Sequence, residues 1–189
     1  MSMNSGHSRR TFGGDSMLFE DHFRNLRNQK IACYYWEPTE EPRALLLISH
    51  GMTEHTMVYD DIAQEMVQKG FFVFGHDHVG HGRSDGPRAL INDVHELVED
   101  SLMHIQRIRK QYPNLPLFLC GHSMGGAVAV FLAFQVPVNG MALIAPALAV
   151  NPETATFFTV TVSKLMSKFF HGSRWLQRII LLQLGIKIL

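Results

Sequence analysis

A serine with a glycine two residues away on either side is the strongest chemical signal in this sequence. Ser123 lies in the run Gly121-His122-Ser123-Met124-Gly125, between a short apolar stretch and a helix-forming one. A strand, a sharp turn with the serine at its tip and a helix together expose a nucleophilic hydroxyl. The two glycines lack the Cβ atoms that would clash where strand and helix approach each other. We therefore predict that Ser123 is a nucleophile and that the backbone N–H of Met124 points at a developing oxyanion.

The same spacing occurs a second time, in the run Gly82-Arg83-Ser84-Asp85-Gly86. This copy follows polar residues and leads into Pro87, so no strand runs into it and no helix follows at once. We expect a loop here, without a nucleophile.

Acyl transfer in such a site needs a second oxyanion donor, which comes from the loop after an earlier strand. The run His50-Gly51-Met52 follows the apolar segment 44–49 and is suited to this role. Gly51 lets the backbone approach closely, and the N–H of Met52 could face that of Met124. The sequence therefore predicts Met52 and Met124 as the two backbone donors of an oxyanion hole.

Composition narrows the class of protein. The chain has 189 residues, of which 46% are hydrophobic, enough for one globular domain with a core. Its 17 Lys and Arg residues balance 17 Asp and Glu residues, so no basic field suggests a nucleic-acid partner. The two cysteines, Cys33 and Cys120, give no disulfide framework, which fits a reducing compartment such as the cytoplasm. We expect residues 1–17 to be a flexible tail without a secretory signal.

Apolar runs without alternation, typical of strands covered on both faces, alternate with stretches of helical period. One helix is indicated by an apolar stripe that ends at Gly70, and a longer one runs from about 92 to 112 with Asn92 as its N-cap. This order predicts an α/β fold with a mostly parallel sheet and with the site at the carboxyl ends of its strands. The expected strands are 30–36, 44–49, 71–74, the run before Gly121, and 140–145.

The character of the chain changes after Asn151-Pro152. Aromatic and aliphatic residues then keep helical spacing opposite Lys164 and Lys168, and the apolar run 176–189 is too short and too often charged to span a bilayer. Two interpretations stay open: a helix that packs on the domain, or a lid or membrane-surface element.

An ordered set of motifs resembles the monoglyceride lipases of the α/β-hydrolase fold, over about residues 28–165. By this resemblance Ser123 would be acylated, Met52 and Met124 would donate to the oxyanion, and no cofactor would be needed. The resemblance also places Glu54, His55 and His122 at the glycerol end of the pocket, and it makes the segment after 151 the start of a cap that touches membranes. The motifs are His50-Gly51-Met52-Thr53-Glu54-His55, the run from His76 to Gly86, Gly121-His122-Ser123-Met124-Gly125-Gly126, and Asn151-Pro152-Glu153-Thr154.

The sequence also departs from those lipases. Met52 replaces the smaller residue that is usual after His-Gly, and Val58 stands where relatives often have arginine. In this fold the acid and the histidine of the triad follow the serine far downstream. After residue 123 the only histidine is His171 and the only acid is Glu153, both in the cap-like region. The triad Asp and His are therefore absent from these residues, and the chain looks like an N-terminal fragment or truncated form.

Other histidines offer alternatives. His76, His78 and His81 flank Asp77, but no Cys or Glu completes a zinc spacing, so we expect no metal there and a loop-capping role for Asp77.

His122 or His50 could serve as the base for the serine. However, the ring of His122 should diverge from the serine hydroxyl, His50 ends a different strand, and neither gains an obvious carboxylate partner.

Two classes of function fit these observations. The first is a serine hydrolase that cleaves a monoacylglycerol or a related lipid ester through an acyl-serine, weak or inactive in this chain; a lysophospholipase or serine aminopeptidase of the same fold stays open. The second is a non-catalytic product that binds a membrane or a partner through its amphipathic end. The expected layout is a tail at 1–17, a hydrolase core at 18–150 and the start of a cap at 151–189, with the oligomeric state unassigned.

Overall fold

The computed structural model describes residues 9–11 and 16–148. By its contacts the chain divides into two units, Met1–Pro146 and Ala147–Leu189, and every described helix and strand belongs to the first. The expected cap segment, 151–189, lies outside the described residues. The elements are β1 (Arg9–Thr11), β2 (Ser16–Arg24), β3 (Lys30–Pro38), β4 (Ala44–Ser49), the 3-10 turn η1 (Thr56–Tyr59), α1 (Asp60–Gln68), β5 (Phe71–His76), α2 (Val94–Gln111), β6 (Leu117–His122), α3 (Met124–Ala133) and β7 (Gly140–Ile144).

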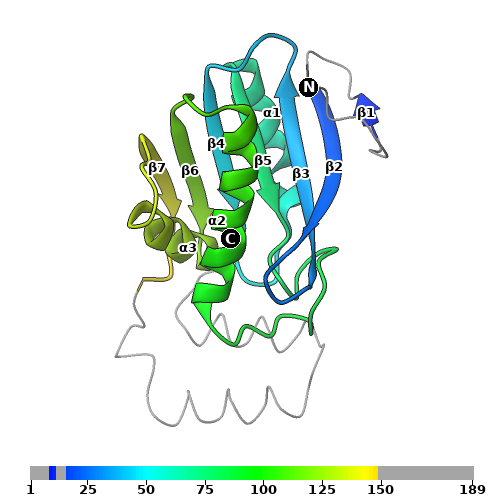
Figure 1. Cartoon of the computed structure of the whole chain (residues 1–189), viewed down its shortest axis with the longest axis vertical. Coiled ribbons are helices and arrows are strands. Elements are labelled where there is room, and N and C mark those ends of the chain that lie inside the picture. The colour runs from blue at the N-terminus through cyan, green and yellow to red at the C-terminus, as the bar shows by residue number, and fades with distance from the viewer. Residues whose placement is uncertain (1–8, 12–15, 149–189) are drawn as a thin grey trace. The chain divides into compact units, whose positions relative to one another are not determined.

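The described strands form one mixed sheet in the order β1-β2-β3-β5-β4-β6-β7 (Figure 1). β5, β4, β6 and β7 pair in parallel, as the alternation of strands and helices predicts. All six residues of β4 are buried, which fits a central strand covered on both faces. The carboxyl ends of β4 and β6 lie side by side, because Ser49 pairs with Gly121.

The other half of the sheet is antiparallel and was not predicted. β1, β2 and β3 pair antiparallel, and β3 pairs antiparallel with β5. The expected tail at 1–17 is thus wrong in part, since β1 and the start of β2 fall within that range. β2 carries polar residues between the buried Leu18 and Phe23, so it has no continuous apolar run to mark it. Its pairing with β3 along nine residues makes it a strand.

Two hydrophobic cores lie on opposite faces of this sheet, because successive side chains of a strand point to opposite sides. The first core takes Tyr35 from β3 and Leu47 from β4, together with residues of α2 and α3. The second takes their neighbours Trp36 and Ile48, together with Ala63 and other residues of α1. Helices therefore cover both faces, the layered arrangement expected of an α/β protein.

Two expectations about individual elements are wrong. The N-cap of α2 is Asp93 and not Asn92, because Asp93 is extended and its Oδ1 accepts the backbone N–H of His95 at 2.8 Å. Strand β7 is not buried: Met141 and Ile144 are 43% and 45% exposed. Among the described strands β7 pairs only with β6, so it forms an edge of the sheet with uncovered side chains.

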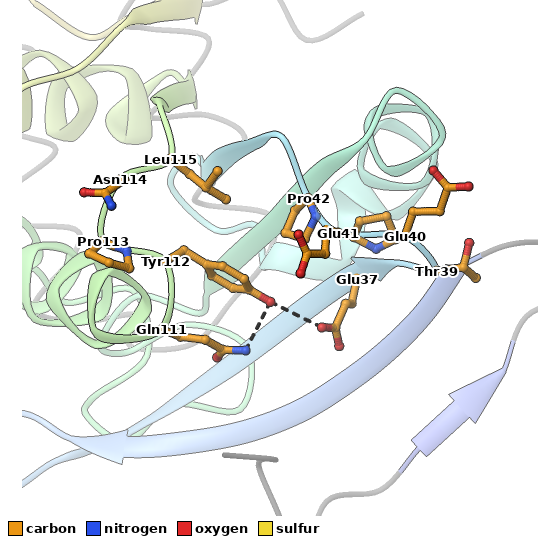
Figure 2. A pocket seen from close by; sticks show the side chains of 11 residues that line it. Glu37, Thr39, Glu40, Glu41, Pro42, Gln111, Tyr112, Pro113, Asn114 and Leu115 are labelled. Atoms are coloured by element: carbon orange, nitrogen blue, oxygen red, sulfur yellow. Dashed lines mark hydrogen bonds between the residues drawn. The ribbon is translucent and has the colours of Figure 1, made fainter.

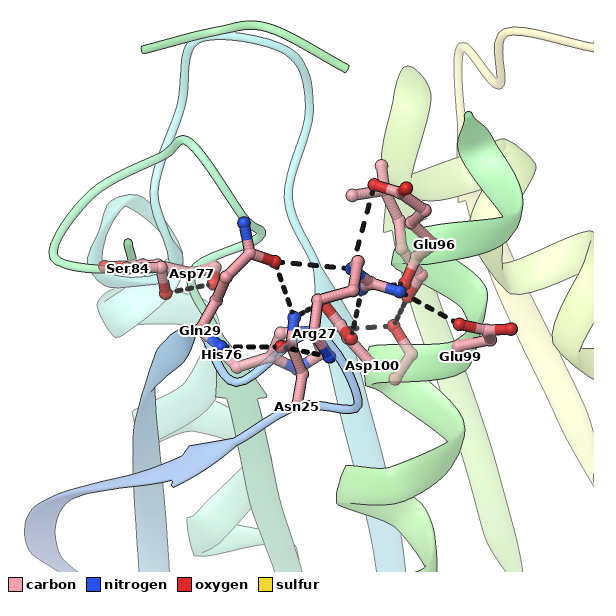
Figure 3. A network of polar contacts seen from close by, with 11 residues as sticks. Asn25, Arg27, Gln29, His76, Asp77, Ser84, Glu96, Glu99 and Asp100 are labelled. Atoms are coloured by element: carbon pink, nitrogen blue, oxygen red, sulfur yellow. Dashed lines mark hydrogen bonds and ion pairs between the residues drawn. The ribbon is translucent and has the colours of Figure 1, made fainter. Parts of the chain in front are cut away.

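An ion pair between the partly exposed Arg27 and the buried Asp100 fastens the β2–β3 turn to α2 (Figure 3). The guanidinium of Arg27 donates to Asp100 Oδ1 at 2.6 Å and to Glu99 Oε2 at 2.9 Å. The other oxygen of Asp100 accepts from Asn25 Nδ2 at 3.1 Å. Asp100 is fully buried, so these contacts supply the compensation that a buried carboxylate needs.

Within the described part of the chain, the helices are too short or too polar to cross a bilayer.

Candidate active site

Ser123 lies at the tip of the sharp turn that the sequence predicts. β6 runs directly into it, and α3 begins at Met124. Its backbone has φ 50° and ψ −115°, in the left-handed range that a side chain rarely adopts. The Ser123 N–H donates to the carbonyl of Ile144 at 2.9 Å, and the Ser123 carbonyl accepts from Gly126 at 3.0 Å. These bonds hold the strained residue between strand, helix and the neighbouring β7.

The hydroxyl of Ser123 is available for chemistry. The residue is 7% exposed, and no hydrogen bond involves its Oγ within the described residues. A nucleophilic serine must be free to bond to a substrate carbonyl, so this geometry suits that role.

The glycines beside Ser123 allow strand, helix and the preceding loop to meet. A Cβ on Gly121 would lie 2.8 Å from the Cα of Gly126. A Cβ on Gly125 would overlap with the carbonyl oxygen of Ser49 and would lie 2.6 Å from that of His50. The first turn of α3 therefore packs on the backbone at the carboxyl end of β4, where the loop that carries Met52 begins.

Met52 lies in the loop after β4, and Met124 is the first residue of α3. Both side chains pack on the same hydrophobic core, the one that α2 and α3 share. Neither backbone N–H donates a hydrogen bond to any group in the described residues. Unpaired amides beside a nucleophile can stabilise negative charge that develops on a carbonyl oxygen. Their role in an oxyanion hole stays a prediction.

Glu54 binds three groups at once. Its Oε2 accepts from the Gly51 N–H at 2.7 Å, from the Tyr59 hydroxyl at 2.6 Å and from His122 Nδ1 at 3.1 Å. Oε1 lies 3.0 Å from the same ring nitrogen. The expectation that His122 lacks a carboxylate partner is therefore wrong: the partner comes from a loop 68 residues earlier in the chain, a separation that the sequence does not show.

Burial and hydrogen bonding act on Glu54 in opposite directions. Burial is the largest influence and raises the pKa of the carboxyl group, but the hydrogen bonds from Tyr59, Gly51 and His122 together outweigh it. The pKa of Glu54 therefore lies below its ordinary value, and the group is a carboxylate at neutral pH. Tyr59 was missed by sequence analysis because it ends the 3-10 turn η1, which has no strong periodic signal.

His50 is fixed as a neutral ring and does not serve as the base. Its Nε2 accepts the backbone N–H of His78 at 2.9 Å, so the proton must lie on Nδ1, which donates to the carbonyl of Gly51 at 2.8 Å. Burial lowers the pKa of His50 to about 4. His55, in contrast, is exposed, and its side chain has no polar contact within the described residues.

Asp77 caps loop amides, as the sequence predicts. Its Oδ1 accepts from the Thr56 N–H and its Oδ2 from the Arg83 N–H, both at 2.8 Å, and the Tyr34 hydroxyl also donates to Oδ2 at 3.0 Å. Ser84 lies in the same loop and donates to the Asp77 carbonyl at 2.5 Å. The second glycine-flanked serine is therefore a structural loop residue, as expected.

A chain of buried neutral groups connects β3, β5 and α2. Ser101 donates to the Leu97 carbonyl at 2.7 Å, so its oxygen is left to accept from His76 Nε2 at 3.5 Å. His76 Nδ1 and His104 Nδ1 lie 3.2 Å apart, and His104 Nε2 is 3.1 Å from the Tyr35 hydroxyl. If His76 carries its proton on Nε2 and His104 carries its proton on Nδ1, each of these contacts has one donor and one acceptor, and both rings are neutral. Among the described residues, no group of three or more His, Cys, Asp and Glu side chains is arranged to hold a metal ion.

A hollow of about 570 Å³ lies away from the serine (Figure 2). It is formed by the end of β3, including Glu37, by the turn that follows it, including Pro42, and by the α2–β6 connection, including Tyr112 and Leu115. These segments precede β4 and β6, whereas Ser123 follows β6. The hollow is therefore at the opposite end of the parallel strands from the site that the motifs indicate.

Comparisons with known proteins agree with this geometry. Residues 40–182 match the family model described as "Serine aminopeptidase, S33". The chain is 45% identical over 156 residues to the monoglyceride lipase of Homo sapiens, a match that covers 80% of this chain and 52% of that protein. It is 32% identical over 154 residues to a monoacylglycerol lipase of Mycolicibacterium smegmatis, with coverage of 81% and 55%.

The fold has solved counterparts as well. A soluble variant of the monoglyceride lipase from Saccharomyces cerevisiae aligns with a TM-score of 0.63 at 24% identity, over 79% of this chain and 52% of that one. The chain spans about half the length of the curated relatives that it matches.

Proposed function

Because the chain belongs to the serine aminopeptidase S33 family and has the α/β-hydrolase fold that its sequence predicts, we propose that it is a serine hydrolase of lipid esters, with monoacylglycerol as substrate. One observation carries this proposal: Ser123 is held at positive φ between β6 and α3, and the first turn of α3 packs on the end of β4, where the loop of Met52 begins. The monoglyceride lipases among its relatives support the choice of substrate.

In the proposed reaction, Ser123 Oγ attacks the ester carbonyl carbon. The oxygen of the resulting tetrahedral intermediate accepts hydrogen bonds from the N–H groups of Met52 and Met124, which stabilise its charge. The C–O bond to glycerol then breaks, and the glycerol oxygen leaves as an alcohol with the proton that Ser123 gave up. Water next attacks the acyl-serine, which releases the fatty acid and returns a proton to Ser123 Oγ.

The proton of Ser123 requires a base that the described residues do not show. Within residues 9–11 and 16–148, no histidine forms a hydrogen bond with Ser123 Oγ. Both ring nitrogens of His50 form hydrogen bonds with backbone groups, and His122 Nδ1 is bound to Glu54. The proposal therefore assigns neither of them as the base.

The cellular setting is also part of the proposal. A cytoplasmic location is supported by Cys33 and Cys120, which are both buried and unpaired. Contact with a lipid surface through the segment after residue 151 rests on the sequence pattern alone, because that segment lies outside the described residues.

Hydrolysis by the purified chain tests the assignment. We expect release of fatty acid from a monoacylglycerol to be slow, because the described residues show no base for Ser123, to exceed hydrolysis of a lysophospholipid and of an aminoacyl p-nitroanilide, and to fall to background in Ser123→Ala. Ser84→Ala is the matched control from the second glycine-flanked motif, and it should keep the activity when its circular dichroism is unchanged. Hydrolysis above background at equal rates by Ser123→Ala and wild type would rule out the proposed nucleophile, and a preference for the anilide would favour a peptidase.

A further inference from the structure

The carboxylate of Glu54 joins the two segments that carry the proposed oxyanion donors. On one side it accepts the N–H of Gly51, the residue before Met52. On the other it binds the ring of His122, the residue before Ser123. The Tyr59 hydroxyl, from the end of η1, holds the same carboxylate from a third direction.

The loop that carries Met52 needs such support. Thr53 has φ 65°, a conformation that costs free energy for a residue with a side chain. The Glu54 N–H donates to the Gly51 carbonyl at 3.3 Å, a long contact that closes the turn only weakly. The side chain of Glu54 reinforces that turn from outside, since its bond to the Gly51 N–H is 2.7 Å long.

The fit between this loop and the turn at Ser123 is close. A Cβ on Gly51 would lie 2.9 Å from His122 Nδ1 and 3.0 Å from Glu54 Oε2. The backbone of the loop therefore lies directly against the Glu54–His122 pair, and a change in that pair would be transmitted to the amide of Met52.

We propose that Glu54 is a positioning residue, which clamps the loop of residues 51–54 onto the turn at Ser123 and thereby fixes the Met52 N–H relative to that of Met124. This inference rests on the proposed function, because the alignment of the two amides matters only if an oxyanion forms between them. It differs from the role that the family resemblance implies for Glu54, which is contact with the glycerol of the substrate.

The hydrogen-bond capacity of Glu54 favours positioning over substrate contact. A carboxylate offers about four lone-pair sites. Three donors already bind this carboxylate: the amide of Gly51, the hydroxyl of Tyr59 and the ring of His122. All three contact Oε2, and Oε1 lies 3.0 Å from the same ring nitrogen of His122, so a substrate hydroxyl would have room only at Oε1.

The first test compares two esters with the same acyl chain: a monoacylglycerol, and a p-nitrophenyl ester that lacks glycerol. In Glu54→Ala we expect kcat to fall about 10- to 100-fold on both, below the 10²–10³-fold cost of losing an oxyanion donor outright, with KM within about twofold. Glu54→Gln keeps an oxygen for Gly51 and Tyr59 and should lose less. The exposed Glu65 of α1 supplies the matched control, Glu65→Gln, which should match wild type.

The second test needs no turnover and so separates failure of the clamp from failure of the proposed function. We expect amide hydrogen exchange in residues 50–59 to be about tenfold faster or more in Glu54→Ala and Tyr59→Phe than in wild type, with no change in Glu65→Gln. If wild type hydrolyses neither ester, hydrolysis by this chain is not supported, and the exchange rates alone decide whether the clamp exists.

Two results would overturn the positioning role. One is a loss confined to the monoacylglycerol and expressed in KM, which would assign Glu54 to glycerol binding. The other is wild-type exchange over residues 50–59 in both Glu54→Ala and Tyr59→Phe. Should Glu54→Ala fail to fold, Glu54→Gln and Tyr59→Phe give the same comparison.

Discussion

The Cα atom of Gly125 packs against the carbonyl oxygen of Ser49, so closely that a methyl group on Gly125 would overlap with that oxygen. This contact joins the first turn of α3 to the last residue of β4, two elements that are far apart in the chain. It places the turn at Ser123 next to the loop that begins at His50. The proposed nucleophile and both proposed oxyanion donors depend on this one approach.

Gly125→Ala tests that dependence. Because the obstacle is backbone and not a flexible side chain, α3 and β4 must separate, and we expect the free energy of unfolding to fall by about 3 kcal/mol or more. Urea denaturation followed by circular dichroism measures this change. Gly140→Ala is the matched control: its Cβ would lie 3.1 Å from the side chain of Phe118, which can shift, so a cost as large as that of Gly125→Ala would contradict the argument.

The strain at Ser123 predicts that glycine is more stable than alanine at this position. Glycine tolerates φ 50°, so Ser123→Gly should be more stable than Ser123→Ala by about 1 kcal/mol, although both lack the nucleophile. Thermal denaturation of the two variants measures the difference. Ala133→Gly, at the end of α3, provides the reference for a glycine in ordinary helical backbone and should be destabilising. A Ser123→Gly variant less stable than Ser123→Ala would show that the turn is not strained.

The buried histidines predict a loss of stability in acid. Burial lowers the pKa of His50 to about 4 and that of His76 to about 3, against about 6.5 in an unfolded chain. As pH falls from about 6.5 to about 4, the unfolded state binds protons that the native state does not, so the native state loses up to about 1.4 kcal/mol per pH unit for each histidine. At about pH 8 these groups are neutral in both states and add no slope.

Urea denaturation between pH 4 and pH 8 measures this slope. In His104→Gln, which removes one further histidine whose pKa burial lowers well below its ordinary value, the slope should be smaller than in wild type. In His95→Gln, where the side chain is exposed, it should be unchanged. A flat pH profile for wild type would contradict the buried neutral state.

The ion pair between Arg27 and Asp100 predicts a large loss of stability when its cation is removed. In Arg27→Ala, Asp100 stays buried without its cation, and we expect a loss of about 3 kcal/mol in the free energy of unfolding, measured by urea titration at pH 7. Lys110→Ala removes an exposed cation from α2, the helix that carries Asp100, and its free energy of unfolding should stay within about 0.5 kcal/mol of wild type. Equal effects of the two variants would mean that solvent reaches Asp100.

The sequence by itself determined the strand, turn and helix around Ser123, the central strand β4 and the α/β class. These features depend on short apolar runs, glycines at fixed spacing and helical periodicity, all of which are local in the chain. It also separated Ser123 from Ser84, because only one of the two serines follows an apolar run and precedes a helix.

Only the tertiary structure decided how distant segments meet. Three contacts join residues from different parts of the fold. They are the bond of Glu54 to His122, the bond that His50 Nε2 accepts from His78, and the ion pair of Arg27 with the buried Asp100. β2 likewise became a strand through its partner β3 and not through its own pattern. The local sequence pattern determines which face of a helix or strand is apolar. It does not determine which polar groups pair, because a buried polar group needs a hydrogen bond and forms it with whatever group the fold brings close to it.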